Sequence, residues 1–193
     1  ASYMRVGCVS ADLPEEFIPA IRKFFKEIEV RFDEMVRLVA PNEIFLGRTK
    51  NIGILDAETT VEYGVTGPNL RAAGIKFDLR KESPYGIYDR FDFEVPVLKN
   101  GDCYDRFTIR ILEVQQSLKI IKQAVEAIPE GSVLGKVPKV IKPPKGEVFH
   151  QIEGSKGNLG FYIVSDGSAK PYRIHVHSPS FVNIGVIPKI AKG

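Results

Sequence analysis

The sequence predicts an α+β fold, in which two long helices of a bundle are joined by short connecting elements to a small antiparallel β-meander. Three observations support this prediction. Apolar residues recur every three or four positions over residues 17–39 and 104–128, which is typical of helices that bury one face along their length. Between residues 41 and 96 the pattern is short and broken. After residue 146 come segments rich in aromatic and β-branched residues, separated by turns that contain glycine.

The first predicted helix begins after Asp12, which we expect to cap it together with Glu15, three residues later. Pro19 cannot donate a backbone hydrogen bond, so a late start or a kink is expected there. Pro41 ends the helix. The apolar face is expected to lie in the core. It comprises Phe17, Ile21, Phe24, Ile28, Phe32, Met35 and Val39.

Short helical turns are expected after the first helix. Residues 42–46 add one turn, and either Asp56 or Thr59 caps a short helix that ends near Gly64. Gly67-Pro68-Asn69 starts another turn.

Two short extended pieces are expected next. Apolar residues alternate with polar ones at residues 75–79 and again at residues 91–95. Residues 79–85 between them are highly charged, and we expect them to form a solvated surface loop.

The second long helix has clear start and stop signals. Asn100-Gly101 makes a tight turn, Asp102 can cap the helix, and Asp105 lies in the first turn, where the helix dipole favours negative charge. Pro129 and Gly131 end the helix. Its apolar face comprises Tyr104, Phe107, Ile111, Val114, Leu118, Ile121, Val125 and Ile128.

The last part of the chain differs in character. Residues 132–144 contain three prolines, three lysines and no hydrophobic period, which is typical of a linker. The predicted organisation is therefore a helical bundle portion with a short irregular and extended insert at 1–131, a linker at 132–146, and a small antiparallel sheet with the start of a helix at 147–193. The three strands are expected at 146–152, 159–164 and 172–176.

Composition excludes several classes of function. The chain has 193 residues with 27 Lys and Arg against 24 Asp and Glu, so its net charge of +3 does not favour a nucleic-acid partner. No apolar run approaches the roughly 18–20 residues that cross a bilayer. Cys8 and Cys103 lie far apart, outside any Cys-x-x-Cys spacing, which fits a reducing compartment and gives no metal or iron–sulfur site.

Candidate chemical groups are few. His175 and His177 share one face of a predicted strand and His150 lies on another strand, but the fixed spacing of a zinc site is lacking, so we favour polar or half-buried strand residues. The glycines of residues 154–160 join strand to strand, so they do not predict dinucleotide binding. Cys103 has no sequence partner that would activate it as a nucleophile. The residues alone therefore predict no active site.

Short motifs with a family resemblance occur in order along nearly the whole chain. Among them are Ala1-Ser2-Tyr3-Met4-Arg5, Leu70-Arg71-Ala72-Ala73-Gly74, Asp78-Leu79-Arg80-Lys81, Lys99-Asn100-Gly101-Asp102-Cys103-Tyr104-Asp105-Arg106 and Lys170-Pro171-Tyr172-Arg173. Together they resemble the large quinone-site subunit, or D subunit, of respiratory complex I, NADH-quinone oxidoreductase. The alternative is the large subunit of a membrane-bound energy-converting [NiFe] hydrogenase, which shares the fold and some motifs but requires two Cys-x-x-Cys pairs outside this window.

The resemblance implies a role within a larger assembly. In that family, the large quinone-site protein packs against the subunit that carries the terminal [4Fe-4S] cluster, and quinone is reduced between them by residues upstream of Ala1. The chain is thus expected to be a fragment of the C-terminal half of the large quinone-site protein. It would supply scaffold and interface, hold no cofactor and be inactive alone, at the cytoplasmic face of the membrane. The implied electron donor is NADH, ferredoxin or a deazaflavin.

The implied partners are the iron–sulfur subunit and the other peripheral-arm subunits, with quinone in the intact complex. Two bundle helices without their neighbours would also expose apolar faces, so self-association of the chain is expected. No residue is assigned a catalytic or metal-binding role.

Six charged residues in the motif turns are candidates for the interface with the cluster subunit or the quinone cavity. Arg106 is the strongest candidate, because arginine suits bidentate pairing with a carboxylate and Asp102, four residues earlier, could orient it. The six are Arg80, Lys81, Asp102, Arg106, Lys156 and Arg173.

Overall fold

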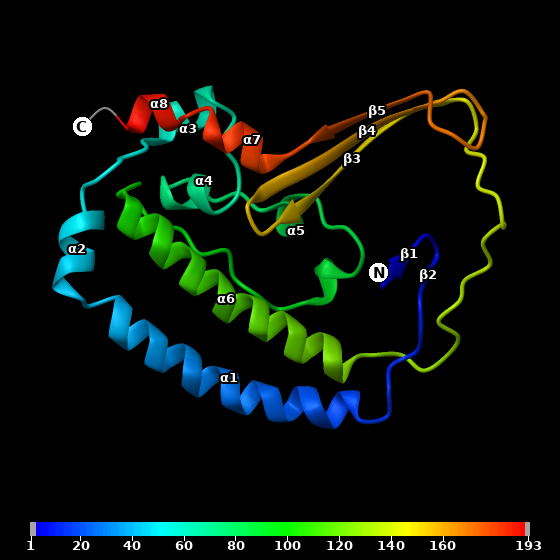
Figure 1. Ribbon diagram of the computed structural model, residues 1–193, viewed down its shortest axis with the longest axis horizontal. Coiled ribbons are helices and arrows are strands. Elements are labelled where there is room, and N and C mark those ends of the chain that lie inside the picture. Colours follow the sequence, from blue (N-terminus) through cyan, green and yellow to red (C-terminus); the bar gives the residue numbers. More distant parts are fainter. Residues whose placement is uncertain (1–2, 192–193) are drawn as a thin grey trace.

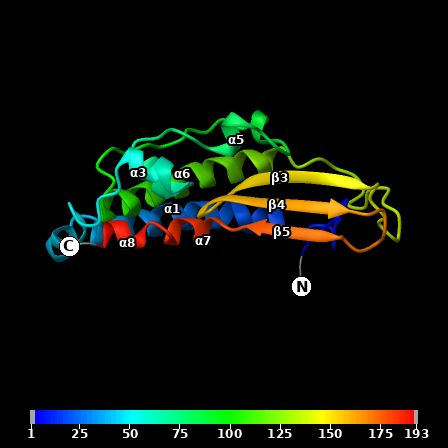
Figure 2. The same cartoon turned by 90° about the horizontal axis from the view of Figure 1, so that it is seen from above.

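The computed structural model describes residues 3–191 and confirms the α+β class. The two longest helices, α1 (Phe17–Val39) and α6 (Cys103–Glu126), lie side by side along one side of the molecule. A three-stranded sheet lies across from them and projects beyond the short helices (Figures 1 and 2).

Helix α1 starts later than its predicted cap. Asp12 does not cap it, because its carboxylate accepts a hydrogen bond from the N–H of the next residue, Leu13, at 2.7 Å. Glu16 occupies the cap position without a side-chain hydrogen bond, and the helix begins at Phe17. Pro19 thus lies in the first turn, where its missing N–H is not needed. The expected late start is confirmed, and the expected capping box is wrong.

Helix α6 starts as predicted. The Asp102 carboxylate accepts a hydrogen bond from the N–H of Asp105 at 2.7 Å. Gly101 precedes it with a φ of 64°, and a Cβ at this position would collide with the carbonyl of Leu55. Glycine is therefore required at this turn. The helix ends at Glu126, with Ala127 as its C-cap.

Short helices connect α1 to α6. Asn42 and Asp56 cap the first two of them, accepting hydrogen bonds from the N–H groups of Phe45 and Thr59. The predicted turns are confirmed, and Asp56 rather than Thr59 is the cap. The elements are α2 (Glu43–Thr49), α3 (Ala57–Glu62), α4 (Pro68–Ala72), α5 (Leu79–Glu82) and the 3-10 turn η1 (Tyr88–Arg90).

Residues 75–78 carry no helix and Asp78 is extended, so the expected extended piece ends one residue early. The loop expected at 79–85 is wrong for residues 79–82, whereas residues 81–84 are exposed as expected. Leu79 instead starts α5 and is buried, and Asp78 caps this short helix. A helical turn forms here because the capping carboxylate satisfies the backbone N–H of Arg80 at 2.9 Å.

Residues 91–98 form no strand, although their apolar residues alternate. The backbone N–H groups of Asp92 and Glu94 instead donate to the side chains of Gln123 and Gln116 of α6, at 2.8 and 2.9 Å. The alternation therefore reflects burial against α6 rather than pairing with another strand.

The antiparallel meander is confirmed. Strands β3 (Gly146–Gly154), β4 (Gly157–Ser165) and β5 (Arg173–His177) pair in that order, and Ser155-Lys156 forms the first turn. A small hairpin of β1 (Met4–Arg5) and β2 (Cys8–Val9) was not predicted.

The register of the sheet separates the histidines. His150 pairs with Phe161 of β4, whereas His175 pairs with the next residue, Tyr162. Successive side chains of a strand point to opposite faces, so His150 lies on the other face from His175 and His177.

The chain closes with two short helices where one helix start was expected, α7 (Pro179–Ile184) and α8 (Ile187–Ile190). Residues 132–145 carry no helix or strand; their one bridge joins Leu134 to Cys8.

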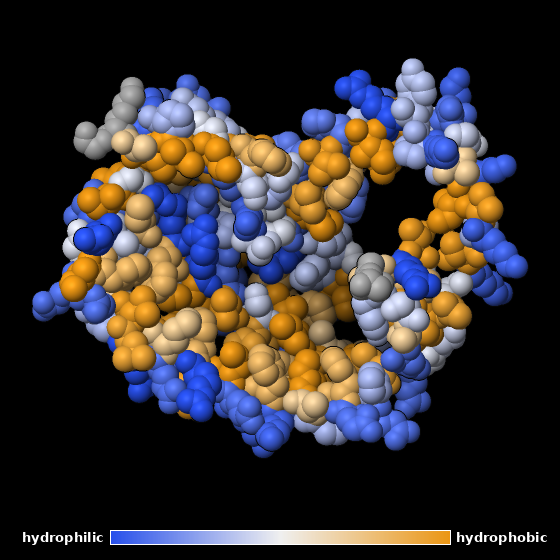
Figure 3. Space-filling model, in the orientation of Figure 1, coloured by the Kyte–Doolittle hydropathy of each residue, from blue (hydrophilic) through white to orange (hydrophobic). Residues whose placement is uncertain are grey.

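Buried apolar residues of the described part of the chain include two small packed clusters. Leu55, Val65 and Val186 pack together, and Phe91, Phe93 and Ile120 form the second cluster. The expected burial of the α1 face is wrong, because its residues are half-buried or exposed. The one buried residue of α1, Phe25, is not among them. Apolar side chains gather over α1 and α6 on the face shown in Figure 3. No helix within residues 3–191 combines the length and apolar character that a membrane crossing requires.

Candidate functional site

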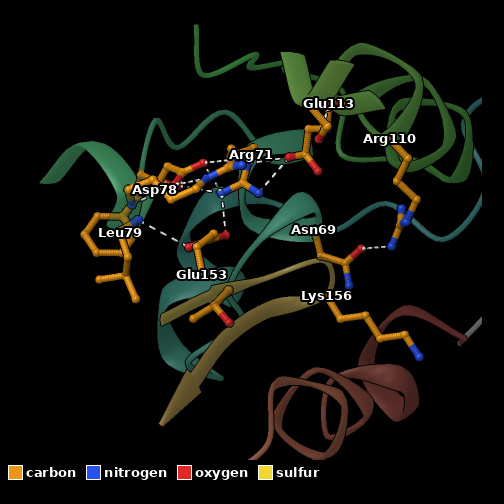
Figure 4. Close-up of polar contacts among 12 residues, drawn as sticks. Asn69, Arg71, Asp78, Leu79, Arg110, Glu113, Glu153 and Lys156 are labelled. Atoms are coloured by element: carbon orange, nitrogen blue, oxygen red, sulfur yellow. Dashed lines mark hydrogen bonds and ion pairs between the residues drawn. The ribbon is translucent and has the colours of Figure 1, made fainter. Parts of the chain in front are cut away.

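The most unusual group in the structure is the buried guanidinium of Arg71, on α4 (Figure 4). Its residue is 1% exposed, yet three carboxylates from three other segments surround it. Its nitrogens lie 3.7 Å from Asp78, 2.6 Å from Glu113 of α6 and 3.0 Å from Glu153 of β3. A buried charge is tolerated when it is paired and hydrogen-bonded, so these contacts determine whether the four segments can pack together.

Asp78 also binds a second guanidinium, that of Arg80. Its carboxylate accepts hydrogen bonds from Nε and Nη2 of Arg80 at 2.9 and 2.6 Å, a bidentate pair. Arg80 lies 5.0 Å from the centre of the Phe93 ring. Burial lowers the pKa of Arg80, but the hydrogen bonds and charge of Asp78 outweigh it, and the pKa is raised.

Glu153 attaches the β3–β4 hairpin to the helices. One carboxylate oxygen accepts from Arg71 and the other from the N–H of Leu79 at 3.2 Å. The Tyr85 hydroxyl accepts from the Glu153 N–H at 3.0 Å and donates to its carbonyl at 3.3 Å. Burial raises the pKa of the Glu153 carboxyl, against the opposing charge of Arg71. Burial likewise raises the pKa of Tyr85.

The tip of the hairpin is fastened on its other side. The Thr66 hydroxyl accepts from the N–H of Asn158 at 3.0 Å, and the Asn183 side chain of α7 donates to the carbonyl of Lys156 at 2.9 Å. The Lys156 side chain stays exposed. The hairpin is therefore held from both sides, with one lysine presented at its tip.

A cavity of about 360 Å³ lies between α6 and the hairpin. Arg110 borders it, where its guanidinium donates to the Asn69 side chain at 3.2 Å, and burial lowers the pKa of Arg110. The lining of the cavity comprises Arg71, Arg80, Arg110, Glu113, Val114, Ser117, Glu153, Gly154 and Ser155.

The chemistry of this network is electrostatic. The Ser117 hydroxyl donates to the carbonyl of Glu113 at 2.8 Å, as part of the helix and not toward a base. We therefore describe the Arg71 network, defined as Arg71, Asp78, Glu113 and Glu153 together with Arg80, as a clamp that joins four segments.

Two of the six predicted interface residues lie at this clamp. Arg80 belongs to the network, and Lys81 places its ammonium 4.1 Å from the centre of the Phe93 ring. Lys156 is at the nearby hairpin tip. Arg173 is exposed at the start of β5, at the end of the sheet opposite Lys156.

The expected orientation of Arg106 by Asp102 is wrong. The Asp102 carboxylate accepts from the N–H groups of Asp105 and Asn51, because a capping side chain turns back over the first turn of its own helix. The Arg106 guanidinium donates to the carbonyl of Gly101 at 2.5 Å.

Sequence reasoning missed Arg71, Glu113 and Glu153. One signal was visible, since Arg71 is a lone charge among the small and apolar residues 70–74. Two of the three carboxylate partners of Arg71, Glu113 and Glu153, lie 42 and 82 residues away in sequence, beyond the reach of any local pattern.

The fit to an iron–sulfur cluster is poor. Cys8 lies in β2 and Cys103 begins α6, while a cluster is ordinarily held by four thiolates. No group of three or more His, Cys, Asp or Glu side chains within residues 3–191 is placed to hold a metal ion.

Comparison with known proteins identifies the family. The family model of the respiratory-chain NADH dehydrogenase, 49 kDa subunit, matches residues 1–143 and 135–193. The chain is 60% identical over 192 residues to the D subunit of NADH-quinone oxidoreductase from Clostridium beijerinckii, covering 100% of this chain and 52% of that protein. It is 54% identical over 192 residues to the D subunit of the enzyme from Carboxydothermus hydrogenoformans, covering 100% of this chain and 53% of that protein.

The chain thus spans about half the length of the curated relatives it matches. The match runs through every element that forms the Arg71 network. The chain therefore belongs to the family of the 49 kDa subunit of respiratory-chain NADH dehydrogenase.

Proposed function

We propose that this chain supplies scaffold and partner interface to the quinone-site subunit of a complex I-type oxidoreductase. The observation that carries the proposal is the Arg71 network, which fixes the hairpin against α6 and so presents Lys156 in one position. The relatives are named as parts of NADH-quinone oxidoreductase and not of a hydrogenase, so the hydrogenase alternative is not proposed.

The redox groups belong elsewhere in this proposal. Quinone, a [4Fe-4S] cluster on a neighbouring subunit, and NADH or another electron donor act in the parent complex, and the chain alone is inactive. Its two separate cysteines support this assignment, because they cannot supply the ligands of a cluster. The chain would act at the cytoplasmic face of the membrane, as a peripheral part of the complex.

The six candidate residues divide by exposure. Lys156 and Arg173 are exposed and available to a partner, whereas Arg80 and Asp102 pair within the chain and would act by positioning. Lys81 is exposed, yet its ammonium donates to the carbonyl of Phe91 at 3.4 Å. Arg106 is half-buried and donates to backbone carbonyls. We assign Lys156 to the contact with the iron–sulfur subunit, where an ammonium suits an acidic surface.

The proposal is tested with the purified 193-residue chain. After anaerobic incubation with iron and sulfide it should show no iron–sulfur absorption band and no quinone reduction with NADH or reduced ferredoxin. It should still retain the iron–sulfur subunit of a related complex in a pull-down. A cluster band that disappears on Cys103→Ser, or a failure to retain the iron–sulfur partner, would contradict the proposal.

A further inference from the structure

A second cavity, separate from the Arg71 network, lies between the loop of residues 51–54, the start of α6 and α8. Its volume is about 590 Å³. Small-molecule sites typically measure about 300–1,000 Å³ and combine apolar walls with a few polar groups. This cavity has both. The groups that matter are Ile52, Ile54, Ile187, Ile190, Arg106 and Lys189.

We call this space the Arg106 cavity. Its walls are aliphatic and partly open to solvent. Ile52, Ile54 and Ile187 are each half-exposed. Ile190 packs at its base against the core cluster of Leu55, Val65 and Val186. An alkyl chain in the cavity would remove these isoleucine surfaces from water, which is favourable.

The Arg106 guanidinium brings positive charge to this apolar cavity. Besides its bond to Gly101, it donates to the carbonyl of Gly53 at 2.8 Å and contacts Sγ of Cys103 at 3.1 Å. None of these three partners is a carboxylate. Within residues 3–191 no carboxylate lies within ion-pair distance of Arg106.

Within residues 3–191 no carboxylate forms an ion pair with Lys189, the second cation of the cavity. Lys189 on α8 is exposed, and its charge acts on Asp56 through space without forming an ion pair. The carboxylates of Asp102 and Asp105 bind backbone N–H groups instead. The cavity therefore joins two cations to an aliphatic surface.

We propose that the Arg106 cavity binds a single-chain amphiphile with an anionic head group. A carboxylate or phosphate would bind Arg106 and Lys189, and the alkyl chain would lie along the isoleucines. A neutral ligand would leave the Arg106 guanidinium without an anionic partner, and a small inorganic anion would leave the aliphatic surface exposed to water. The head group has two possible sources, a free fatty acid and a phospholipid-like monoester.

The test uses the 193-residue chain and four twelve-carbon probes below their micelle concentrations. Dodecanoate and dodecyl phosphate carry the two anionic heads, dodecanol is neutral, and dodecyltrimethylammonium is cationic. Calorimetry gives affinity and stoichiometry, and methyl-labelled isoleucine NMR locates the ligand. We expect one equivalent of an anionic probe to bind, to shift the Ile52, Ile54 and Ile187 methyl signals, and to bind about tenfold more tightly than dodecanol. The tighter anion identifies the source.

Variants distinguish specific binding of the anionic head group from non-specific binding of the alkyl chain. Lys189→Gln should weaken binding of the anions about fivefold without changing dodecanol binding or the melting temperature. Lys136→Gln, in the linker, is the matched control and should change nothing. Equal binding of all four probes, or an unchanged affinity in Lys189→Gln and in Arg106→Gln, would overturn the proposal.

Discussion

At the scale of single residues, Arg71 contacts three carboxylates that come from three other segments of the chain. Replacing it with methionine keeps much of the side-chain volume but leaves those carboxylates buried beside one another. Removing one partner of a buried ion pair typically costs about 3–5 kcal/mol. We therefore predict that Arg71→Met lowers the free energy of unfolding by this amount in urea titrations.

Arg48→Met is the matched control, because Arg48 is exposed in the last turn of α2. It should change the free energy of unfolding by less than about 0.5 kcal/mol. Equal losses in the two variants would show that the Arg71 network does not hold the four segments together.

Glu153 gives the network a pH dependence. Burial raises the pKa of its carboxyl in the folded state above the ordinary value of 4.5, so the folded chain binds this proton more tightly than the unfolded chain. The stability due to this proton is fully present below the unfolded pKa and is lost as pH rises through the folded pKa.

The difference in unfolding free energy between the native chain and Glu153→Gln should therefore fall as pH rises above about 4.5. Urea titrations at a series of pH values measure it. A difference that grows with pH over this range would mean that Arg71 lowers the pKa of Glu153 and that the assigned direction is wrong.

Local residue roles were predictable where the interaction spans three or four positions. Asp102 caps α6 as its sequence position indicates, because the cap and Asp105 are three residues apart. The role of Asp102 toward Arg106 was predicted wrongly, because one carboxylate cannot both turn over the first helical turn and reach outward. Arg71 could be noticed but not paired, since its partners lie on segments that meet only in three dimensions.

At the scale of elements, the amphipathic patterns predicted the two long helices well. The start of α1 was misplaced because Asp12 binds its neighbour, Leu13, instead of the helix. The piece at 91–95 carries no helix, in keeping with the expected extended segment, but the backbone N–H groups of Asp92 and Glu94 bind glutamine side chains and no neighbouring strand. Alternation reveals burial, and it cannot identify what supplies the backbone hydrogen bonds.

Helix α1 exposes several large apolar side chains to solvent. Phe24, Met35 and Leu38 are 49%, 48% and 76% exposed and lie on one side of the helix. A second copy could cover them. We predict that the isolated chain self-associates, and that Phe24→Glu or Leu38→Glu shifts it toward monomer in sedimentation velocity experiments.

Val30 is the control, since it is 58% exposed but lies on a different side of α1. Val30→Glu should leave the sedimentation profile unchanged. A native chain that stays monomeric at high concentration would show that the exposed apolar residues of α1 do not form a contact between copies.

At the scale of the whole molecule, the hairpin is fixed to the helices by buried charge on one side and by Asn183 on the other. Its tip presents Lys156 to solvent. The predicted meander and linker placed Lys156 at a turn, but the attachment of that turn to α4, α6 and α7 could not be read from local patterns. We propose that this fixed tip contacts the iron–sulfur subunit of the parent complex.

Lys156→Glu in the intact enzyme tests this contact, with Lys136→Glu in the linker as the control. The measurement is the amount of iron–sulfur subunit that co-purifies with the tagged quinone-site subunit. We expect a loss of at least about half for Lys156→Glu, because the substitution places like charges at the contact, and no loss for the control. Full co-purification of the iron–sulfur subunit with the Lys156→Glu enzyme would contradict this proposal.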